Sequence, residues 1–123
     1  MLSLPLFFLS CKREGLGGEA TVVVYPQFNS SPEINHISYP DTVYIKFHTT
    51  DFPGSNPGAY DTYFAGSPRQ DIITCSKLKW GDYFFYVAAY DSTIHGRVTG
   101  GVHVKIRERD RKKTQNVTVA LSE

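Results

Sequence analysis

The sequence has little that favours helices, and it has no excess of charge of one sign. After residue 20, no segment places apolar residues at helical spacing over three turns, so a helical fold is not expected. Thirteen Lys and Arg residues stand against twelve Asp and Glu residues, for a formal net charge of +1. Because a nucleic-acid-binding protein needs a concentrated basic face, this balance predicts no nucleic-acid partner.

The sequence also lacks an apolar run long enough to cross a membrane. Its first apolar stretch, Leu2 to Leu9, has eight residues and is interrupted by Ser3 and Pro5, whereas a spanning helix needs about 20. Eight residues fit the apolar part of a signal peptide, and the small residue Ser10 stands directly before Cys11.

An apolar run that ends in a small residue and then Cys resembles the cleavage box of bacterial lipoproteins. The resemblance implies that residues 1–10 are a removed signal peptide and that Cys11 carries the lipid. Residues 11–18 would then be a polar tether, and multiple acyl chains would anchor the protein firmly to a membrane. It would lie in the cell envelope, in the outer membrane, facing the periplasm or the surface. The alternative is that the apolar run is a buried N-terminal strand.

Cysteine is scarce, with Cys11 and Cys75 only. Two cysteines in an exported protein can pair. If Cys11 carries lipid, however, Cys75 is left alone, and it is then most simply a small buried apolar residue.

What the chain does contain is aromatic and β-branched residues in the two-residue period of strands. Seven such segments recur at roughly ten-residue spacing with Gly, Pro, Asn and Asp between them, which is typical of an antiparallel sandwich or barrel. A parallel sheet is not expected, because helical crossovers would need more connecting chain. We therefore predict an all-β, seven-stranded antiparallel sandwich over residues 19–123. Its strands are expected at Glu19–Tyr25, Asp41–His48, Tyr60–Ala65, Asp71–Cys75, Asp82–Asp91, Arg97–Arg107 and Val117–Leu121.

Three details of this pattern are specific. The first strand is expected to stop at Pro26, because Pro cannot donate to a ladder. The segment Asp82–Asp91 is apolar or aromatic on both faces, so it is expected to be central and covered on both sides. The segment between Thr50 and Ala59 has two Pro and two Gly residues, and it is expected to be a loop rather than a short helix.

Two stretches carry a further resemblance. One reads Gly81-Asp82-Tyr83-Phe84-Phe85-Tyr86-Val87-Ala88-Ala89, and the other reads Val98-Thr99-Gly100-Gly101-Val102-His103-Val104-Lys105-Ile106. The first resembles a strand of transthyretin-like and carboxypeptidase-regulatory-like sandwiches. The second, with Tyr90-Asp91 before it, is similar to the ending of small lipoproteins of gut Gram-negative anaerobes. The resemblance covers roughly residues 70–121. It implies a Greek-key, prealbumin-like sandwich and transfers no catalytic residue.

The residues suited to catalysis or metal binding form no pattern typical of such a site. The four histidines, at positions 36, 48, 95 and 103, lack the spacing of a local metal site. Asp91, Ser92 and His95 lie close in sequence, but a hydrolytic triad is set by geometry, and a hairpin turn after Asp91 explains them better. We predict no catalytic residue, no metal site and no cofactor, and keep a small hydrolase as an alternative.

Aromatic residues at predicted loops are the best candidates for ligand binding, because loop aromatics commonly form binding surfaces. Phe52, Tyr60 and Tyr63 are the candidate ligand-binding residues. Tyr39 also lies near a loop, and Trp80 is expected to plug one end of the core.

The segment Lys105–Lys113 has six basic and two acidic residues. It is either a solvated hairpin whose charges protect a sheet edge or a contact for anionic lipid headgroups near the anchor.

Together these patterns predict a non-catalytic binding or scaffold module in the cell envelope. Its partners would be the membrane, through the lipid anchor, and another envelope protein, a peptide or a glycan. An alternative is a subunit that assembles through an uncapped edge strand, for which Tyr60–Ala65 is the candidate.

Overall fold

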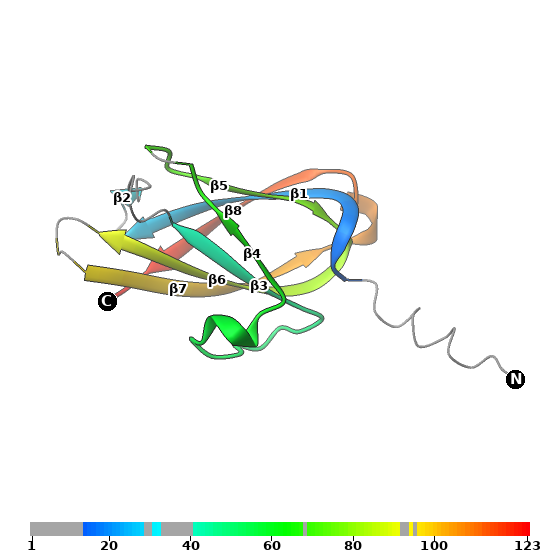
Figure 1. The fold of residues 1–123 in the computed structure, drawn as a ribbon. Helices are drawn as coiled ribbons and strands as arrows, with labels where there is room; N and C mark the ends of the chain where they lie inside the picture. Colours follow the sequence, from blue (N-terminus) through cyan, green and yellow to red (C-terminus); the bar gives the residue numbers. More distant parts are fainter. Residues whose placement is uncertain (1–13, 29–30, 33–40, 68, 92–93, 95) are drawn as a thin grey trace, which may run out of the picture.

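The protein is a β-sandwich of two four-stranded sheets around one core (Figure 1). The computed structural model describes residues 14–28, 31–32, 41–67, 69–91, 94 and 96–123. The strands are β1 (Leu16–Phe28), β2 (Ser31–Pro32), β3 (Thr42–Phe47), β4 (Thr62–Ala65), β5 (Ile73–Leu78), β6 (Gly81–Asp91), β7 (Gly96–Ile106) and β8 (Thr114–Leu121). Two short 3₁₀ turns, η1 (Pro57–Ala59) and η2 (Glu108–Asp110), complete the described elements. None of the helices among these residues is long and apolar enough to span a membrane.

The two sheets differ in strand direction. One sheet, with the order β4-β3-β6-β7, is wholly antiparallel. In the other sheet β1 pairs with β2 and β5 antiparallel and with β8 parallel, from Thr21↔Thr114 to Phe28↔Leu121. The expectation of an entirely antiparallel sandwich is therefore wrong for this pair. A parallel pair needs a long connection between its strands. Here the connection from β1 to β8 consists of the strands β2 to β7 and the segments between them.

Each of the seven predicted segments overlaps one strand, and β2 is an additional short one. The overlap is poorest at Asp71–Cys75, because β5 begins at Ile73 and continues to Leu78. The expected stop at Pro26 is wrong, because β1 continues to Phe28. The register of β1 with β5 ends at Val24, and the register with β2 begins at Gln27. Pro26 therefore lies where the ladder on that side is interrupted, and its missing N–H is tolerated there.

The core lies between the sheets and is built from the inward residues of alternating strands. Val43 and Ile45 of β3 are fully buried, as the alternation predicts. Strand β6 is central, as predicted for Asp82–Asp91. Its inward face is buried, but on its outward face Asp82, Phe84 and Tyr90 are partly exposed, so the predicted cover of both faces is confirmed only in part. Cys75 is a free and fully buried thiol, as expected, and burial raises its pKa to about 12. Trp80 packs against the core, also as expected.

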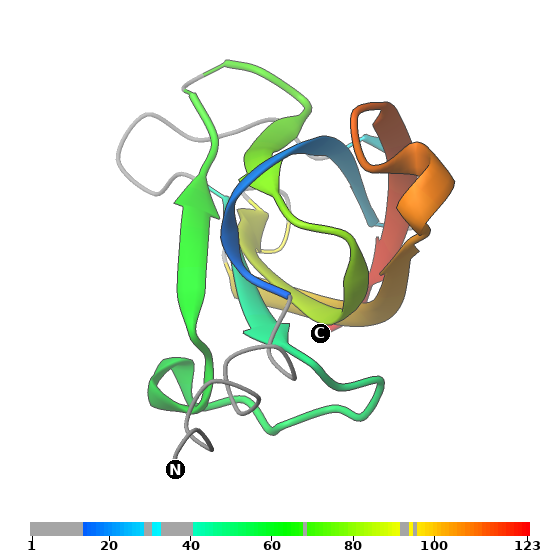
Figure 2. The ribbon, with the colours of Figure 1, turned by 90° about the vertical axis from the view of Figure 1, so that its right-hand side faces the viewer.

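The sheets meet at one side through β7 and β8. Thr99 and Ser122 exchange two backbone hydrogen bonds of 2.9 Å. A Cβ on Gly100 would collide with the carbonyl oxygen of Ala120, so this close approach requires glycine. In Figure 2 the strands surround the core and β4 stands to one side. Among the described strands β4 pairs only with β3, which makes Thr62–Ala65 an edge strand.

The chain is already part of the packed body before Glu19, where the sequence placed the start of the domain. Gly15 donates its N–H to the hydroxyl of Tyr83 at 2.9 Å and accepts the N–H of Lys79 at 2.8 Å. Strand β1 then begins at Leu16. Residues 14–18, which the sequence assigned to a polar tether, thus belong to the folded sandwich. Cys11 and the rest of the predicted leader lie outside the described residues.

Candidate functional site

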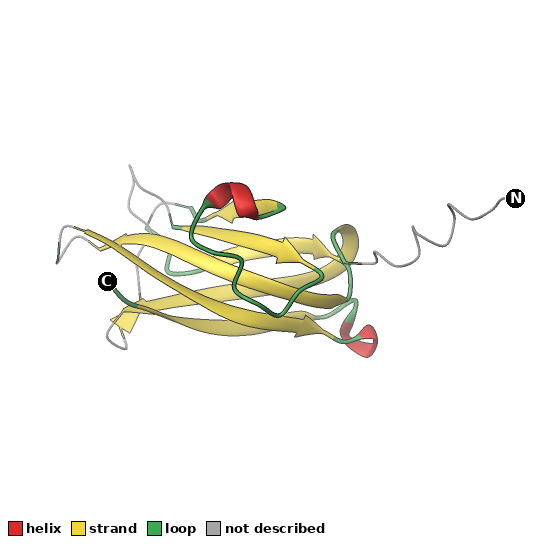
Figure 3. Cartoon of the chain, turned by 90° about the horizontal axis from the view of Figure 1, so that it is seen from below, coloured by secondary structure: helices red, strands yellow, loops and turns green. Residues whose placement is uncertain are grey.

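An aromatic surface covers the outer side of the antiparallel sheet. Tyr44 of β3 stands directly opposite Tyr63 of β4 and Tyr86 of β6 in the strand registers, so their side chains share one face of the sheet. Phe84 lies two residues before Tyr86 and therefore on the same face. The β3–β4 loop crosses this face (Figure 3) and adds Phe52 and Tyr60. We call these six residues the aromatic face: Tyr44, Phe52, Tyr60, Tyr63, Phe84 and Tyr86.

The rings of the aromatic face are in continuous contact. Tyr60 stacks on Tyr86 with centroids 5.7 Å apart and planes at 12°. Phe52 contacts Tyr86 at 5.6 Å and Phe84 at 5.7 Å in tilted geometry. Tyr44 lies 5.9 Å from Tyr60, and also contacts Tyr63 and Tyr86. These separations are within the range in which aromatic pairs attract beyond simple burial.

The exposed fractions divide the aromatic face into a buried floor, formed by Tyr86, and two exposed rings, those of Phe52 and Tyr63. Tyr86 is only 7% exposed, because the loop residues lie over it. Phe52 and Tyr63, in contrast, are 56% and 64% exposed. Phe52 and Tyr63 therefore present apolar ring surface to solvent while they contact other rings of the aromatic face, as is common in binding surfaces.

The loop that carries Phe52 and Tyr60 is held by its own hydrogen bonds. The side chain of Asn56 accepts the N–H of Gly58 at 2.9 Å and begins η1. The hydroxyl of Tyr60 donates to the carbonyl of Gly54 at 2.7 Å. Burial, together with the nearby Tyr86, raises the pKa of Tyr60 to about 12, so this donor stays protonated at neutral pH. The expectation that this segment contains no short helix is wrong at η1, where the cap offsets the cost of the turn.

A polar pocket of about 300 Å³ adjoins the aromatic face. It is lined by Glu14, Lys46, Phe47, His48, Thr49 and Asp61. Lys46 and Asp61 form its border with the aromatic face, since Lys46 is on the outer side of β3 and Asp61 follows Tyr60 in the chain. The ammonium of Lys46 lies 3.5 Å from the carboxylate of Asp61, which also accepts the N–H of Phe47 at 2.7 Å. These groups offer a donor and acceptors beside the exposed rings.

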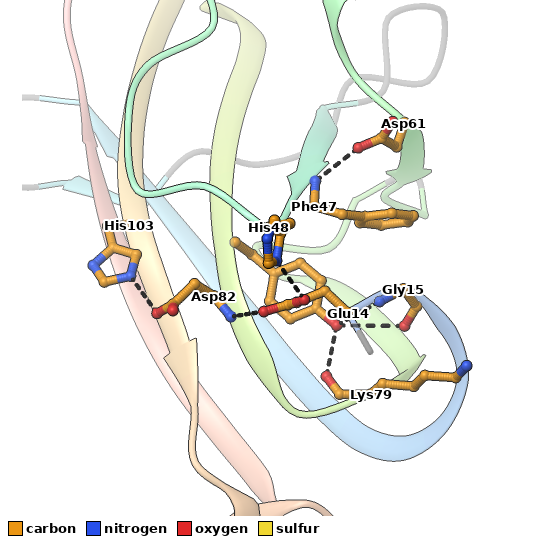
Figure 4. A network of polar contacts seen from close by, with 9 residues as sticks. Glu14, Gly15, Phe47, His48, Asp61, Lys79, Asp82 and His103 are labelled. Carbon is orange, nitrogen blue, oxygen red and sulfur yellow. Dashed lines mark hydrogen bonds and ion pairs between the residues drawn. The ribbon is translucent and has the colours of Figure 1, made fainter. Parts of the chain in front are cut away.

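Glu14 closes the deeper side of this pocket (Figure 4). One oxygen of its buried carboxylate lies 2.8 Å from Nδ1 of His48, and the other accepts the N–H of Asp82 at 3.1 Å. Burial alone would raise the pKa of Glu14, but the hydrogen bonds from Asp82 and His48 and the charge of His48 hold the pKa below its usual value. A Cβ on Gly81 would collide with this carboxylate, so glycine makes room for it. Glu14 therefore links the segment before β1 to the end of β3 and to the start of β6.

The two described histidines do not form a metal site. β6 separates the strands of His48 and His103, and His103 contacts Asp82 at 3.1 Å instead. No group of three His, Cys, Asp or Glu side chains among the described residues is arranged to hold a metal ion. Of the residues considered for a hydrolytic triad, Asp91 is buried at the end of β6, and Ser92 and His95 lie outside the described residues.

The structure brings together all three aromatic residues that the sequence singled out, Phe52, Tyr60 and Tyr63. Sequence reasoning placed Tyr44 on an outward strand face but did not connect it with the loop. It missed Glu14 entirely. The Glu14 partners His48 and Asp82 lie 34 and 68 residues away, so no local pattern marks it. Tyr39 lies outside the described residues.

Comparison with known proteins adds no assignment. No protein-family model, no curated protein and no solved structure matches this chain.

Proposed function

We propose that this protein is a lipid-anchored binding module of the cell envelope, that it performs no catalysis, and that its ligand is a glycan held on the aromatic face. The observation that carries the proposal is the exposure of Phe52 and Tyr63 on a base of contacting aromatic rings. Exposed aromatic surface of this kind commonly marks an interaction site.

The chemistry of the surface favours a sugar. A saccharide ring has apolar C–H faces and a rim of hydroxyl groups, so it needs flat apolar surface and polar groups side by side. Phe52 and Tyr63 supply the first, and the Lys46–Asp61 pair supplies donors and acceptors at the border of the polar pocket. Ligand sites generally combine apolar rings with a few placed polar groups in this way.

The location in the envelope rests on the leader and on Cys11, and the proposal includes kinship with prealbumin-like sandwiches of Greek-key topology. Two positions of the resembling motifs have a structural reason that supports this kinship. Gly81 makes room for the carboxylate of Glu14, and Gly100 allows the approach of β7 to β8.

The experiment is a screen of the protein against a panel of neutral and acidic oligosaccharides, followed by calorimetry on any that bind. F52A and Y63A are each expected to weaken binding about tenfold or more, because a central aromatic contact is commonly worth 1 kcal/mol or more. Y25A, which removes a half-buried ring from the outer face of the other sheet, is the matched control and is expected to bind normally. If no saccharide binds, or if Y25A weakens binding as much as Y63A, the glycan proposal is wrong.

The anchor has its own test. Mass spectrometry of membrane-expressed protein is expected to show a chain that begins at an acylated Cys11. An unmodified chain that begins at Met1 would contradict it.

A second function is favoured by one specific feature. Strand β4 is the edge of its sheet among the described strands, and its outward backbone groups can pair with an added strand of another envelope protein. A substitution of Ala65 by Pro, at this edge, is expected to abolish such assembly and to leave glycan binding intact.

A further inference from the structure

Eight of the eleven Lys and Arg residues in the described part of the chain gather at one end of the sandwich. Thr21, near the start of β1, pairs with Thr114 and donates its N–H to the carbonyl of Lys113 at 3.1 Å. The turn after β5 lies at the same end, because Lys79 donates its N–H to Gly15. Figure 1 shows the beginning of β1 and the β7–β8 hairpin together at this end. We call it the basic end, after its eight exposed bases: Lys77, Lys79, Lys105, Arg107, Arg109, Arg111, Lys112 and Lys113.

Acidic residues offset this charge only in part. Lys112 lies 3.9 Å from Glu19, and Lys113 lies 3.5 Å from Asp110. Both pairs are exposed, and such pairs are weak and exchange readily. Glu108 is the other acidic residue of the hairpin. Asp82, opposite Lys105 in the strand register, and the buried Glu14 are the further acidic residues beside it.

In the described part of the chain, the opposite end has no such excess of exposed bases. Among the described residues, its bases are Arg69 and Arg97, which precede β5 and begin β7. Of its acidic residues, Asp41 and Asp91 are buried, and Asp71 and Glu123 are exposed and balance the two bases. The two ends of the sandwich therefore differ in charge, although the net charge of the protein is near zero. The long-range electrostatic field depends on this distribution of charge and not on the net charge alone.

The basic end is also the end nearest to the predicted lipid. Glu14 is fixed in the fold by His48 and Asp82, and only residues 12 and 13 separate it from Cys11. Three chain steps span at most about 10 Å. This reach is close to the Debye length of about 8 Å at physiological ionic strength, so charges at this end feel an anionic surface that holds the acyl chains.

We propose that the basic end binds the anionic headgroups of the membrane that carries the lipid anchor. This inference rests on the proposed anchor at Cys11. Arg side chains suit the task because their planar guanidinium groups pair with phosphate oxygens in two hydrogen bonds. The contact stands the sandwich on its basic end, and the aromatic face on its side stays open to ligand.

The test uses the full chain with C11A, which keeps the leader but carries no lipid. Binding to vesicles of phosphatidylcholine is compared with binding to vesicles that also contain phosphatidylglycerol. The apolar leader contributes to both, so the difference between them reports the basic end. The anionic vesicles are expected to bind about tenfold more tightly at low salt, and the difference is expected to shrink as salt is added.

Matched double variants locate the effect. R107Q/R109Q is expected to remove most of the preference for anionic vesicles, whereas R69Q/R97Q removes the same charge from the opposite end and is expected to keep it. K79Q/K105Q is a second variant at the basic end, should the first disturb the hairpin, and circular dichroism checks the fold of each.

Three results would overturn the inference. They are equal binding to both kinds of vesicle, an equal loss in R69Q/R97Q, and binding of a short DNA duplex that is as tight as vesicle binding and is lost in R107Q/R109Q. Acylation of Cys11 is measured separately by mass spectrometry, so a missing anchor and an inactive basic end give distinguishable results.

Discussion

The outer faces of the two sheets are built from the same strand period but from different residues. On the sheet of β1, β5 and β8, the outward positions between the buried core residues carry mostly small, polar or β-branched residues and one aromatic ring, that of the half-buried Tyr25. These outward residues are Thr21, Val23, Tyr25, Thr74, Ser76, Asn116, Thr118 and Ala120. The antiparallel sheet carries the aromatic face instead. The contrast between the two faces is therefore the exposure of the Phe52 and Tyr63 rings, which has no counterpart among these described outward residues of the other sheet.

The largest expected effect tests the floor of the aromatic face. Y86A removes a ring that is 7% exposed and that contacts Tyr44, Phe52 and Tyr60. Deleting a buried aromatic side chain of this kind is expected to lower the free energy of unfolding by about 3–5 kcal/mol. T118A, on the outer face of the other sheet, is expected to change it by no more than about 0.5 kcal/mol. Urea unfolding measures both, and similar losses would show that the faces do not differ.

The antiparallel sheet also differs from the other sheet in its buried carboxylates. Asp41 directly precedes β3, and Asp91 is the last residue of β6. Burial raises the pKa of Asp41 from its usual value to about 6. A carboxyl whose pKa is higher in the folded state favours folding when it is protonated. Stability from this group is therefore full below about pH 4 and is lost as the pH rises through about 6.

The protein is consequently expected to gain stability when the pH falls from about 7 to about 5, and D41N is expected to lack this gain. At pH 7, D41N is expected to be more stable than the natural protein, by up to about 3 kcal/mol. Thermal unfolding across this pH range measures it. A variant that is less stable at pH 7 and keeps the pH dependence would contradict the assignment. Below about pH 4.5 the lowered pKa of Glu14 acts in the opposite direction, since its stabilising hydrogen bonds are lost on protonation.

A smaller effect is expected at Gly101, which lies beside the aromatic face on β7. A Cβ at this position would be 2.7 Å from the ring of Phe84, so glycine lets that ring lie across β7. G101A is expected to cost about 1–3 kcal/mol through overpacking and to displace Phe52, which contacts Phe84. The same substitution in an F84A background is expected to cost much less, because the clash is absent. Additive losses in the double variant would rule out this contact as the cause.

The sequence predicts the strands well because their signals are local. Val43 and Ile45 alternate with polar residues on β3, and the run from Asp82 to Asp91 is apolar on both faces. Both patterns depend on burial alone; the first is confirmed, and the second is confirmed for the central place of β6 but only in part for the cover of its outward face.

Two features were beyond such patterns because they depend on residues far apart in the chain. The alternation of β1 and β8 is the same whether they pair in parallel or antiparallel, so their direction left no trace in the sequence. Glu14 looked like part of a polar tether until His48 and Asp82 were seen to hold it. The aromatic face lies between these cases: each outward ring was visible in the sequence, but the loop that unites them was not.

The parallel pairing of β1 with β8 also sets the order in which the protein is completed. β1 is among the first segments to be synthesised, yet Thr21 to Phe28 wait for Thr114 to Leu121 to fill one whole side of their ladder. Until then β1 has an open edge rich in valine, a condition that favours association with other chains. Closing a contact of such long range is slow, because most of the chain must be ordered before the pairing offsets the entropy lost. We therefore expect the pairing of β8 with β1 to form late in folding and to remove the open edge of β1.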